Sequence, residues 1–202
     1  GELLDDKIVN THIENLWNSR GKSNWYQAAS AIKTTDTYAK GASQTIEFDG
    51  QKVNICGIAK GSGMIYPDMA TTLGFVFTDA KIKGNILKHL LKKNIQTTFN
   101  ALSCDGDTST NDMVSIFSTG TAKNKDIKSF KDPKLKDFIN GVHQVMLNLA
   151  KRVAFDGEGA TKFVTIQCIN CKTELDAKNI CFSIANSPLV KTAIFGEDPN
   201  WG

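Results

Sequence analysis

The stretch TIEFDGQKVNIC at residues 45–56 decides the fold class of this chain. Alternating apolar and polar residues lie on both sides of Asp49-Gly50, and this dipeptide between such runs is a strong signal for a β-hairpin turn. The stretch therefore predicts two antiparallel strands, around which the other elements are arranged.

Further strands and helices are expected on both sides of the hairpin. Runs rich in β-forming residues predict strands at 71–80, 113–117 and 163–169. Apolar residues at helical spacing predict helices at 5–20, 25–32, 85–99, 132–153 and 175–186. The elements alternate without clean βαβ repeats. This indicates a mixed α/β fold in one domain, with a largely antiparallel sheet flanked by helices.

Two of the predicted helices are described further, because their sequences show where they begin and which face is buried. The helix at 132–153 begins at Asp132-Pro133, a typical start with an Asp cap and a Pro in the first turn. Gly141 inside it is tolerated at some cost in stability. Its apolar residues are expected to face the core: Leu135, Phe138, Ile139, Val142, Val145, Met146, Leu149 and Val153. In the helix at 85–99, three lysines form a solvated face (Lys88, Lys92, Lys93), and the apolar stripe faces the core (Ile86, Leu87, Leu90, Leu91, Ile95, Phe99).

The composition excludes several classes of protein. Of the 202 residues 41% are hydrophobic, and 24 Lys and Arg against 21 Asp and Glu give a net charge of +3. A mainly disordered chain would be less apolar and more highly charged. No apolar run approaches the ~18 residues of a membrane span, no signal peptide is recognisable, and the basic residues are not clustered for nucleic acid. Five cysteines, an odd number, favour reduced thiols in the cytoplasm.

Three short motifs are similar to known ligand sites but lack essential residues. Gly61-Ser62-Gly63 is followed by Tyr66 where a dinucleotide-binding loop has its third glycine. The stretch DGDTS at 105–109 departs from a calcium-binding loop, and a bend or an active-site loop is the better interpretation. The cysteines Cys168, Cys171 and Cys181 offer three thiols where structural zinc needs four ligands, and the first two would face opposite sides of the predicted strand. No metal site is therefore expected.

A glycine-rich stretch leads into hydroxyl-bearing residues at the junction PDMATT, residues 67–72. Taken alone, this junction says little, because threonine commonly opens a strand. In its context, however, it resembles the ornithine acetyltransferase family, the glutamate N-acetyltransferases of arginine biosynthesis. Five segments match this family in order and spacing: TTDT at 34–37, GIAKGSGMIYPDMATTLGFVFTDA at 57–80, DGDTSTNDM at 105–113, DGEGATKFVTI at 156–166 and SPLVKTAIFGEDPNWG at 187–202.

The resemblance implies that the chain cuts itself between Ala70 and Thr71. Residues 1–70 would then end an α chain, and residues 71–202 would begin a β chain. The Thr71 hydroxyl would attack the preceding carbonyl, and the new N-terminal Thr71 would be the catalytic nucleophile with its own amine as the base. A free α-amine has a pKa of ~7.7–8.0, which suits a general base near neutral pH.

The reaction implied by the resemblance is an acyl transfer in two steps. Thr71 takes the acetyl group from N-acetylornithine, and glutamate then takes it from acetyl-Thr71 to give N-acetylglutamate. Some members of the family also use acetyl-CoA as a donor, and the sequence leaves this alternative open; no cofactor is expected. The resemblance further implies a cytoplasmic enzyme whose α and β chains form an α2β2 heterotetramer, without nucleic-acid or membrane partners.

The family's substrate-binding residues fall on Thr34, Lys60, Thr71 and Glu158. Lys60 would pair with a substrate carboxylate and Glu158 with the ornithine ammonium, so that opposite charges meet a substrate carrying both signs. Thr35, next to Thr34, stays open as the alternative at its position.

Two departures from the family pattern limit these expectations. The family's oxyanion hole, a Thr-Gly pair, would lie before Gly1, and further substrate-binding Asn and Thr residues would follow Gly202. The chain is therefore expected to be the central part, residues 1–202, of one acetyltransferase domain and a fragment of the full fold. Thr72, where the family more usually has Met, adds a rival hydroxyl. Two other functions stay open: a related N-terminal-nucleophile amidase or aminopeptidase, and a non-catalytic fragment.

Overall fold

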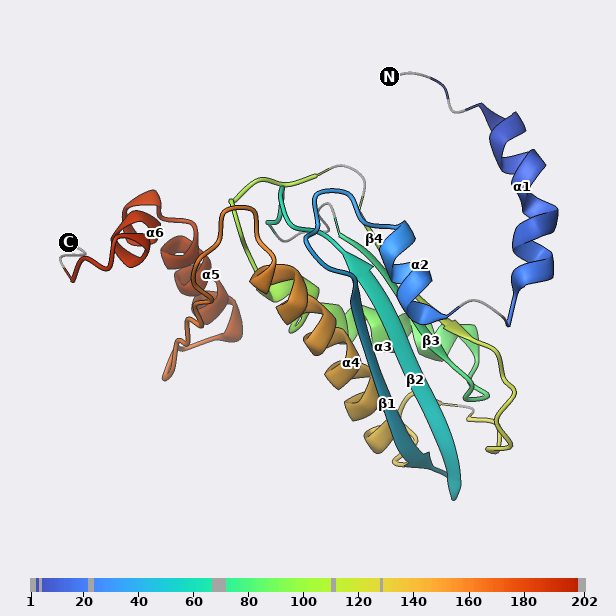
Figure 1. Ribbon diagram of the computed structural model, residues 1–202. Coiled ribbons are helices and arrows are strands. Elements are labelled where there is room, and N and C mark those ends of the chain that lie inside the picture. Colours follow the sequence, from blue (N-terminus) through green and yellow to red (C-terminus); the bar gives the residue numbers. More distant parts are fainter. Residues whose placement is uncertain are drawn as a thin grey trace.

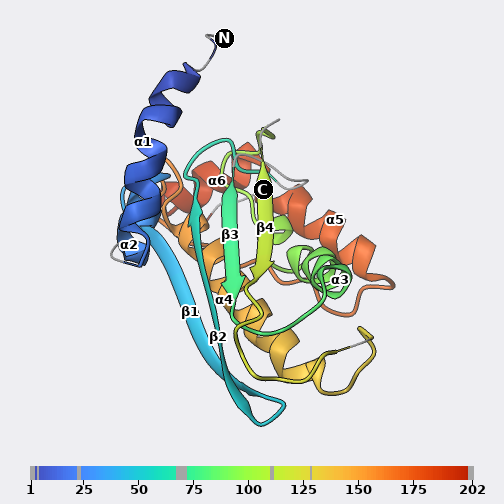
Figure 2. The same ribbon diagram turned by 90° about the vertical axis from the view of Figure 1, so that its right-hand side faces the viewer.

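The computed structural model describes residues 3, 5–21, 24–66, 72–109, 112–127 and 129–199. Its centre is a four-stranded sheet with the strand order β1-β2-β3-β4 (Figure 1). Helices α3 (Gly84–Ile95) and α4 (Leu135–Phe155) cover one face of this sheet, and the short helix α2 (Trp25–Ala31) lies on the other (Figure 2). The predicted mixed α/β fold is confirmed.

The predicted hairpin is the longest strand pair of the sheet. Strands β1 (Lys40–Phe48) and β2 (Gln51–Lys60) pair antiparallel from Lys40 opposite Ala59 to Phe48 opposite Gln51. Asp49 and Gly50 between them have φ angles of 52° and 71°. Positive φ at both positions is what a two-residue turn of type I′ requires, which explains the Asp-Gly sequence.

The other two strands make the sheet mixed. Strand β3 (Leu73–Thr78) runs antiparallel to β2, and β4 (Met113–Ser118) runs parallel to β3. A parallel pair needs a long crossover. Helix α3 and the 3-10 helix η1 (Phe99–Ala101) provide it. Two of the three strand pairs are antiparallel, as the sequence predicts.

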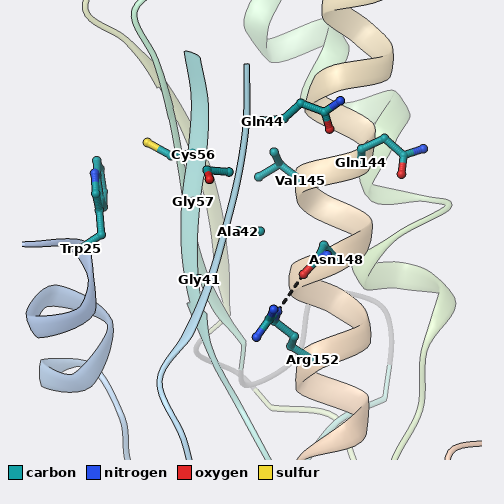
Figure 3. A pocket seen from close by; sticks show the side chains of 11 residues that line it. Trp25, Gly41, Ala42, Gln44, Cys56, Gly57, Gln144, Val145, Asn148 and Arg152 are labelled. Atoms are coloured by element: carbon teal, nitrogen blue, oxygen red, sulfur yellow. Dashed lines mark hydrogen bonds between the residues drawn. The ribbon is translucent and has the colours of Figure 1, made fainter. Parts of the chain in front are cut away.

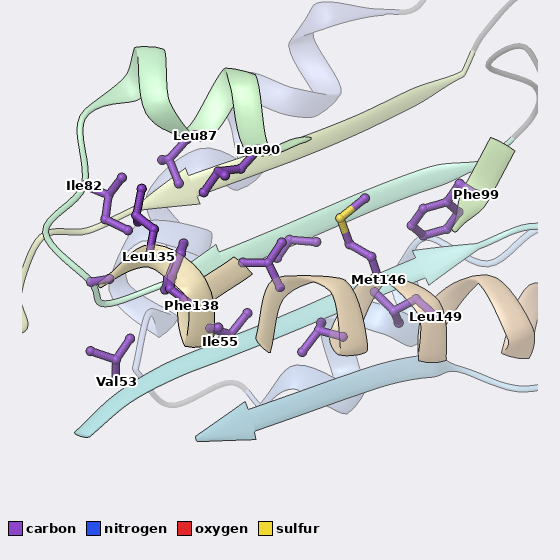
Figure 4. Close-up of a cluster of buried hydrophobic side chains, with 14 of the residues drawn as sticks. Val53, Ile55, Ile82, Leu87, Leu90, Phe99, Leu135, Phe138, Met146 and Leu149 are labelled. Atoms are coloured by element: carbon purple, nitrogen blue, oxygen red, sulfur yellow. The ribbon is translucent and has the colours of Figure 1, made fainter. Parts of the chain in front are cut away.

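The core lies between the sheet and helices α3 and α4 (Figure 4). Helix α4 crosses β1 and β2 so closely that Gly141 has no room for a side chain. A Cβ there would lie 2.8 Å from Cδ1 of Ile55 and 3.0 Å from Cγ2 of Ile46. The glycine that weakens the helix locally therefore permits its closest approach to the sheet. The buried residues of α4 form one stripe: Leu135, Phe138, Gly141, Val142, Val145, Met146, Leu149, Ala150 and Val153.

Helix α4 begins later than its sequence predicts. Asp132 was expected to cap it, but its carboxylate accepts the N–H of Lys134 at 3.0 Å, and its carbonyl oxygen accepts the N–H of Leu135 at 3.0 Å. These bonds close a turn that precedes the helix. Helix α3 ends earlier than its sequence predicts, at Ile95. Phe99, the last residue of the predicted apolar stripe, belongs to η1 and is buried there.

The strand predicted at 163–169 is wrong. Residues 161–169 form neither helix nor strand, and most of them are exposed; Phe163 stacks on Phe155 with ring centroids 4.2 Å apart. β-forming residues stabilise a strand only when a neighbouring strand pairs with them. In the part of the chain described here, the sheet consists of β1–β4 alone.

The remaining helices lie at the periphery. Helices α1 (Asp6–Ser19) and α5 (Glu174–Ala185) contain no buried residue, and α6 (Pro188–Phe195) buries Ala193. The sequence prediction missed α6, although Ser187 followed by Pro188 is a typical cap and first residue. Within the described ranges, no helix is both long and apolar enough to cross a membrane.

Candidate active site

Three of the five motif segments meet at the glycine-rich loop Gly61–Gly63, which follows the end of β2. The N–H of Gly61 donates to Oδ1 of Asp36 at 2.7 Å. The hydroxyl groups of Ser62 and Thr35 lie 2.5 Å apart, and the N–H of Glu158 donates to the carbonyl oxygen of Ser62 at 2.8 Å. The loop is therefore held by the TTDT segment on one side and the DGEG segment on the other.

Gly63 is the point where this loop touches the side chain of Glu158. A Cβ at Gly63 would lie 2.9 Å from both Cδ and Oε2 of Glu158. The missing side chain of Gly63 thus leaves space for the carboxylate group. No described residue forms a hydrogen bond or ion pair with that carboxylate, and Glu158 is exposed.

A buried ion network lies beneath the loop. The side chain of Lys40 is completely buried, and its Nζ lies 2.5 Å from Oδ1 of Asp36 and 2.5 Å from Oδ2 of Asp156. Asp156 also accepts a hydrogen bond from the N–H of Thr37 at 3.0 Å and a short one from the Thr37 hydroxyl. We call Asp36, Lys40 and Asp156 the brace, because these side chains join the TTDT segment to the DGEG segment.

The brace keeps both of its carboxylates ionised. Burial raises the pKa of Asp36, but hydrogen bonds from Gly61, Lys40 and Thr34 outweigh burial and lower that pKa below its ordinary value. Burial also raises the pKa of Asp156, but hydrogen bonds from Lys40 and Thr37 outweigh burial and leave that pKa below its ordinary value. A buried charge is tolerated only when it is paired and hydrogen-bonded, and both conditions are met here.

Asp105 holds the far end of the glycine-rich loop. Its carboxylate accepts the N–H groups of Met64 at 2.5 Å and Ile65 at 2.8 Å, and the N–H of Cys104 donates to the carbonyl oxygen of Ile65 at 2.7 Å. The DGD stretch is therefore a loop that supports the site, in agreement with its interpretation from the sequence.

Asp112, at the end of the same loop, is unlike the other aspartates of this corner. Both of its carboxylate oxygens are buried, and no side chain among the described residues pairs with them. Burial raises its pKa to about 6, against the opposing effects of the Thr72 amide and the Lys60 ammonium. Its place in the DGDTSTNDM segment was the one signal in the sequence, and sequence reasoning did not single it out.

The structure brings together some of the predicted site residues. Lys60, half-buried at the end of β2, and Glu158 lie at the two ends of the glycine-rich loop. Thr34 uses its backbone N–H to bind Oδ2 of Asp36 at 3.2 Å and exposes its side chain, whereas the Thr35 hydroxyl binds Ser62. Ala70 and Thr71, the predicted cleavage site and nucleophile, lie outside the described residues.

The cysteines behave differently from their expected arrangement. The sulfur atoms of Cys168 and Cys171 lie 3.0 Å apart rather than on opposite sides of a strand, because the segment turns at Asn170, whose φ is 62°. Cys181 points its thiol toward the carbonyl oxygen of Ile166 at 3.8 Å. Within the part of the chain described here, no group of three or more His, Cys, Asp or Glu could hold a metal ion.

A cavity of about 480 Å³ lies along the hairpin, between α2 and α4 (Figure 3). Trp25 borders it on one side, and Gln144, Asn148 and Arg152 of α4 border it on the other. The Nε of Arg152 already donates to Oδ1 of Asn148 at 2.8 Å. The lining contains none of the predicted site residues, so the glycine-rich corner is the better candidate for an active site.

Comparisons with known proteins agree with the motif pattern. The model of the ArgJ family matches residues 1–202. Relatives of this chain carry the name "Arginine biosynthesis bifunctional protein ArgJ". The one from Bradyrhizobium diazoefficiens is 49% identical, and the match covers 100% of this chain and 50% of that protein. The one from Streptococcus mutans is 50% identical, and the match covers 86% of this chain and 44% of that protein. The chain spans about half the length of these curated relatives.

A solved structure is also similar. The crystal structure of the arginine biosynthesis bifunctional protein ArgJ from Bacillus halodurans is 39% identical and superposes with a TM-score of 0.58, covering 61% of this chain and 58% of that one. The family predicted from the five motifs is thus confirmed: the chain belongs to the ArgJ family.

Proposed function

We propose that this chain forms the nucleophile-bearing part of an acetyltransferase of arginine biosynthesis. The enzyme moves an acetyl group from N-acetylornithine to glutamate through an ester on Thr71. The observation that carries the proposal is the meeting of three motif segments at Gly61–Gly63, with Lys60 and Glu158 at the two ends of the loop. The names of the relatives support a role in arginine biosynthesis.

Maturation would begin at the bond between Ala70 and Thr71. The Thr71 hydroxyl attacks the carbonyl carbon of Ala70, the C–N bond breaks, and the Thr71 nitrogen leaves as an amine. Water then hydrolyses the ester and leaves a carboxylate on Ala70. The two products would stay together, because β2 and β3 lie on opposite sides of the cut and pair from Ile55 opposite Thr78 to Lys60 opposite Leu73.

Catalysis would use the groups that maturation exposes. The Thr71 amine takes the proton of the Thr71 hydroxyl as the oxygen attacks the acetyl carbonyl of N-acetylornithine, and the proton passes to the leaving ornithine nitrogen. Glutamate then attacks the acetyl ester with its α-amine and releases Thr71. Acetyl-CoA stays open as a second donor, and the reaction needs no cofactor.

The charges of the corner suit this substrate. N-acetylornithine carries a carboxylate and a side-chain ammonium. Lys60 would bind the carboxylate, and Glu158, whose own carboxylate has no partner in the described part of the chain, would bind the ammonium. The exposed hydroxyl of Thr34 would contribute a further hydrogen bond. We also propose a cytoplasmic α2β2 assembly of the cleaved chains.

The test uses the full-length polypeptide. Intact mass of the denatured protein, with sequencing of any new N-terminus, should show two chains, one beginning at Thr71; a Thr71→Ala variant should stay uncut. The purified enzyme should then form N-acetylglutamate from N-acetylornithine and glutamate. Acetate released at the same rate with and without glutamate would identify a hydrolase instead, and an uncut wild-type chain would overturn the proposal.

A further inference from the structure

We propose that Cys168 and Cys171 form a dithiol site that reacts with small-molecule disulfides and closes into a reversible disulfide within the chain. The two residues belong to the stretch QCINC at 167–171, between the DGEG segment and helix α5. The proposal concerns a part of the chain that the acetyl transfer does not use, and it does not depend on the role of Thr71.

The turn between the two cysteines brings their sulfur atoms together. Asn170 has a φ of 62°, in the left-handed region that asparagine tolerates better than most residues. The turn leaves the two Sγ atoms 3.0 Å apart, in hydrogen-bond contact. A disulfide bond is ~2.05 Å long, so the sulfur atoms have about 1 Å left to travel. Closure therefore needs only a small adjustment of the side chains.

Contacts on both sides hold this turn in place. Before the turn, the carbonyl oxygen of Ile166 lies 3.8 Å from the thiol of Cys181, which belongs to α5. After the turn, Thr173 caps α5, and its hydroxyl accepts the N–H of Asp176 at 3.1 Å. The two thiols thus meet on a backbone that is already ordered, which lowers the entropy cost of joining them.

Contact with a second thiol is what sets this pair apart, because all five cysteines are half-buried. Burial raises the pKa of Cys104 to about 11 and also raises the pKa of Cys56. These two thiols therefore seldom form the thiolate that attacks a disulfide. The hydrogen bond with Cys171 raises the pKa of Cys168. We therefore expect Cys171 to attack first, with the S–H of Cys168 donating to its thiolate.

The reaction consists of two exchanges and consumes one small disulfide, for which oxidised glutathione is the probe. The Cys171 thiolate attacks one sulfur atom, the S–S bond of the probe breaks, and the first glutathione leaves and takes up the proton that Cys171 released. The Cys168 thiolate then attacks the sulfur of Cys171 in the mixed disulfide, and the second glutathione leaves with the proton of Cys168. The protein loses two electrons and two protons, and the probe is reduced to two thiols.

The new bond would be a reversible modification rather than a structural crosslink. It closes a ring of only four residues, from Cys168 to Cys171. A ring this short removes little chain entropy, so the bond adds little stability. Accessible disulfides are typically the labile and regulatory ones, and cytoplasmic disulfides are usually transient. A thiol reductant should therefore restore both thiols.

Peptide mass spectrometry on the full-length protein provides the test. Trypsin cuts after Lys162 and Lys172, so both cysteines lie in one peptide, FVTIQCINCK, and Cys181 lies in another. The reduced protein is incubated with oxidised glutathione at pH 8, and the remaining free thiols are blocked with N-ethylmaleimide. The tryptic digest is then analysed with and without dithiothreitol.

In the wild type this peptide should carry neither N-ethylmaleimide nor glutathione, and dithiothreitol should restore both of its thiols. Cys104 should react at least about tenfold more slowly, because its raised pKa leaves little thiolate. Cys168→Ser should stop at the mixed disulfide and keep one glutathione on Cys171. The matched control Cys181→Ser removes a neighbouring thiol outside the pair and should behave as the wild type.

Three results would overturn the proposal. The first is a wild-type peptide with both thiols still blocked by N-ethylmaleimide, as in the untreated protein. The second is a mixed disulfide that persists in the wild type, and the third is a disulfide that joins either cysteine to Cys181. Since the measurement involves no acetyl transfer, a chain that is never cut at Thr71 would remove the proposed function and leave this inference intact.

Discussion

Two kinds of carboxylate lie around the glycine-rich loop. Asp36 and Asp156 are buried in the brace, where each is paired with Lys40 and with hydrogen-bond donors of the backbone. Glu158 forms no ion pair with a described residue and is exposed, and Asp112 is buried without a paired side chain, with the Thr72 amide and the Lys60 ammonium acting on it. Carboxylates that hold the fold are thus paired within the chain, whereas Asp112 and Glu158 lack a paired cation at contact distance among the described residues.

The pKa values follow the same division. Those of Asp36 and Asp156 lie below the ordinary value, because their hydrogen bonds outweigh the effect of burial. The pKa of Asp112 rises to about 6, because the effect of burial outweighs the hydrogen bond from the Thr72 amide and the positive charge of Lys60. A group with a pKa close to neutrality can change its charge during a reaction, whereas a group in the brace cannot.

The largest expected effect comes from breaking the brace. Lys40→Met removes the cation and leaves two buried carboxylates facing each other. The free energy of unfolding of the full-length protein should fall by about 3–5 kcal/mol, because breaking one partner of a buried ion pair leaves uncompensated charge. Urea denaturation at pH 7.5 measures the change.

Lys134→Met is the matched control for this substitution. Lys134 is also paired with an aspartate, Asp49 at 2.7 Å, but its side chain is 50% exposed. Exposed ion pairs contribute only about 0–1 kcal/mol. If Lys40→Met is no more harmful than Lys134→Met, the brace does not stabilise the corner, and the division between the two kinds of carboxylate fails.

An intermediate effect is expected from moving Glu158. Gly63→Ala places a methyl group against its carboxylate, which is the far end of a flexible side chain and can turn away. The KM for N-acetylornithine should rise about tenfold, as expected when a charge-assisted hydrogen bond is weakened, with little change in stability. Initial rates at varied N-acetylornithine provide the measurement.

The control for Gly63→Ala is Gly84→Ala in the first turn of α3, where an added Cβ meets nothing within 4 Å. This variant should leave KM unchanged. An unchanged KM in Gly63→Ala as well would remove Glu158 from the substrate site and leave it an ordinary loop carboxylate.

Local patterns explain how much of this fold could be predicted. The Asp49-Gly50 hairpin and the apolar stripe of α4 depend on neighbours in sequence, and both predictions are confirmed. The strand at 163–169 depends on a distant partner, and that prediction is wrong. Propensity describes what a segment can form, whereas pairing depends on what lies beside it.

Only the site residues that lie in family motifs could be predicted from the sequence. Lys60 and Glu158 followed from the family resemblance, and the structure places them at the two ends of one loop. The brace was missed, because Lys40 and Asp156 are 116 positions apart and neither is unusual by itself. Asp112 was missed because its distinctive property, burial without a paired side chain, exists only in three dimensions.

The smallest effect separates the two kinds of carboxylate most directly. Asp112→Asn should raise the free energy of unfolding of the uncut Thr71→Ala protein at pH 8 by about 1 kcal/mol, because an ionised carboxylate is costlier to bury than a neutral amide of similar shape. The sign follows from linkage: the folded pKa of about 6 exceeds the ordinary 3.8, so ionisation above pH 6 costs stability, and Asn removes that cost.

The same comparison at pH 5 should show a smaller gain, because folded Asp112 is then mostly protonated. Asp36→Asn, measured alongside at pH 8, should destabilise the protein, since it weakens the bonds from Lys40 and Gly61. If Asp112→Asn also destabilises the uncut protein, Asp112 is a structural carboxylate of the same kind as Asp36.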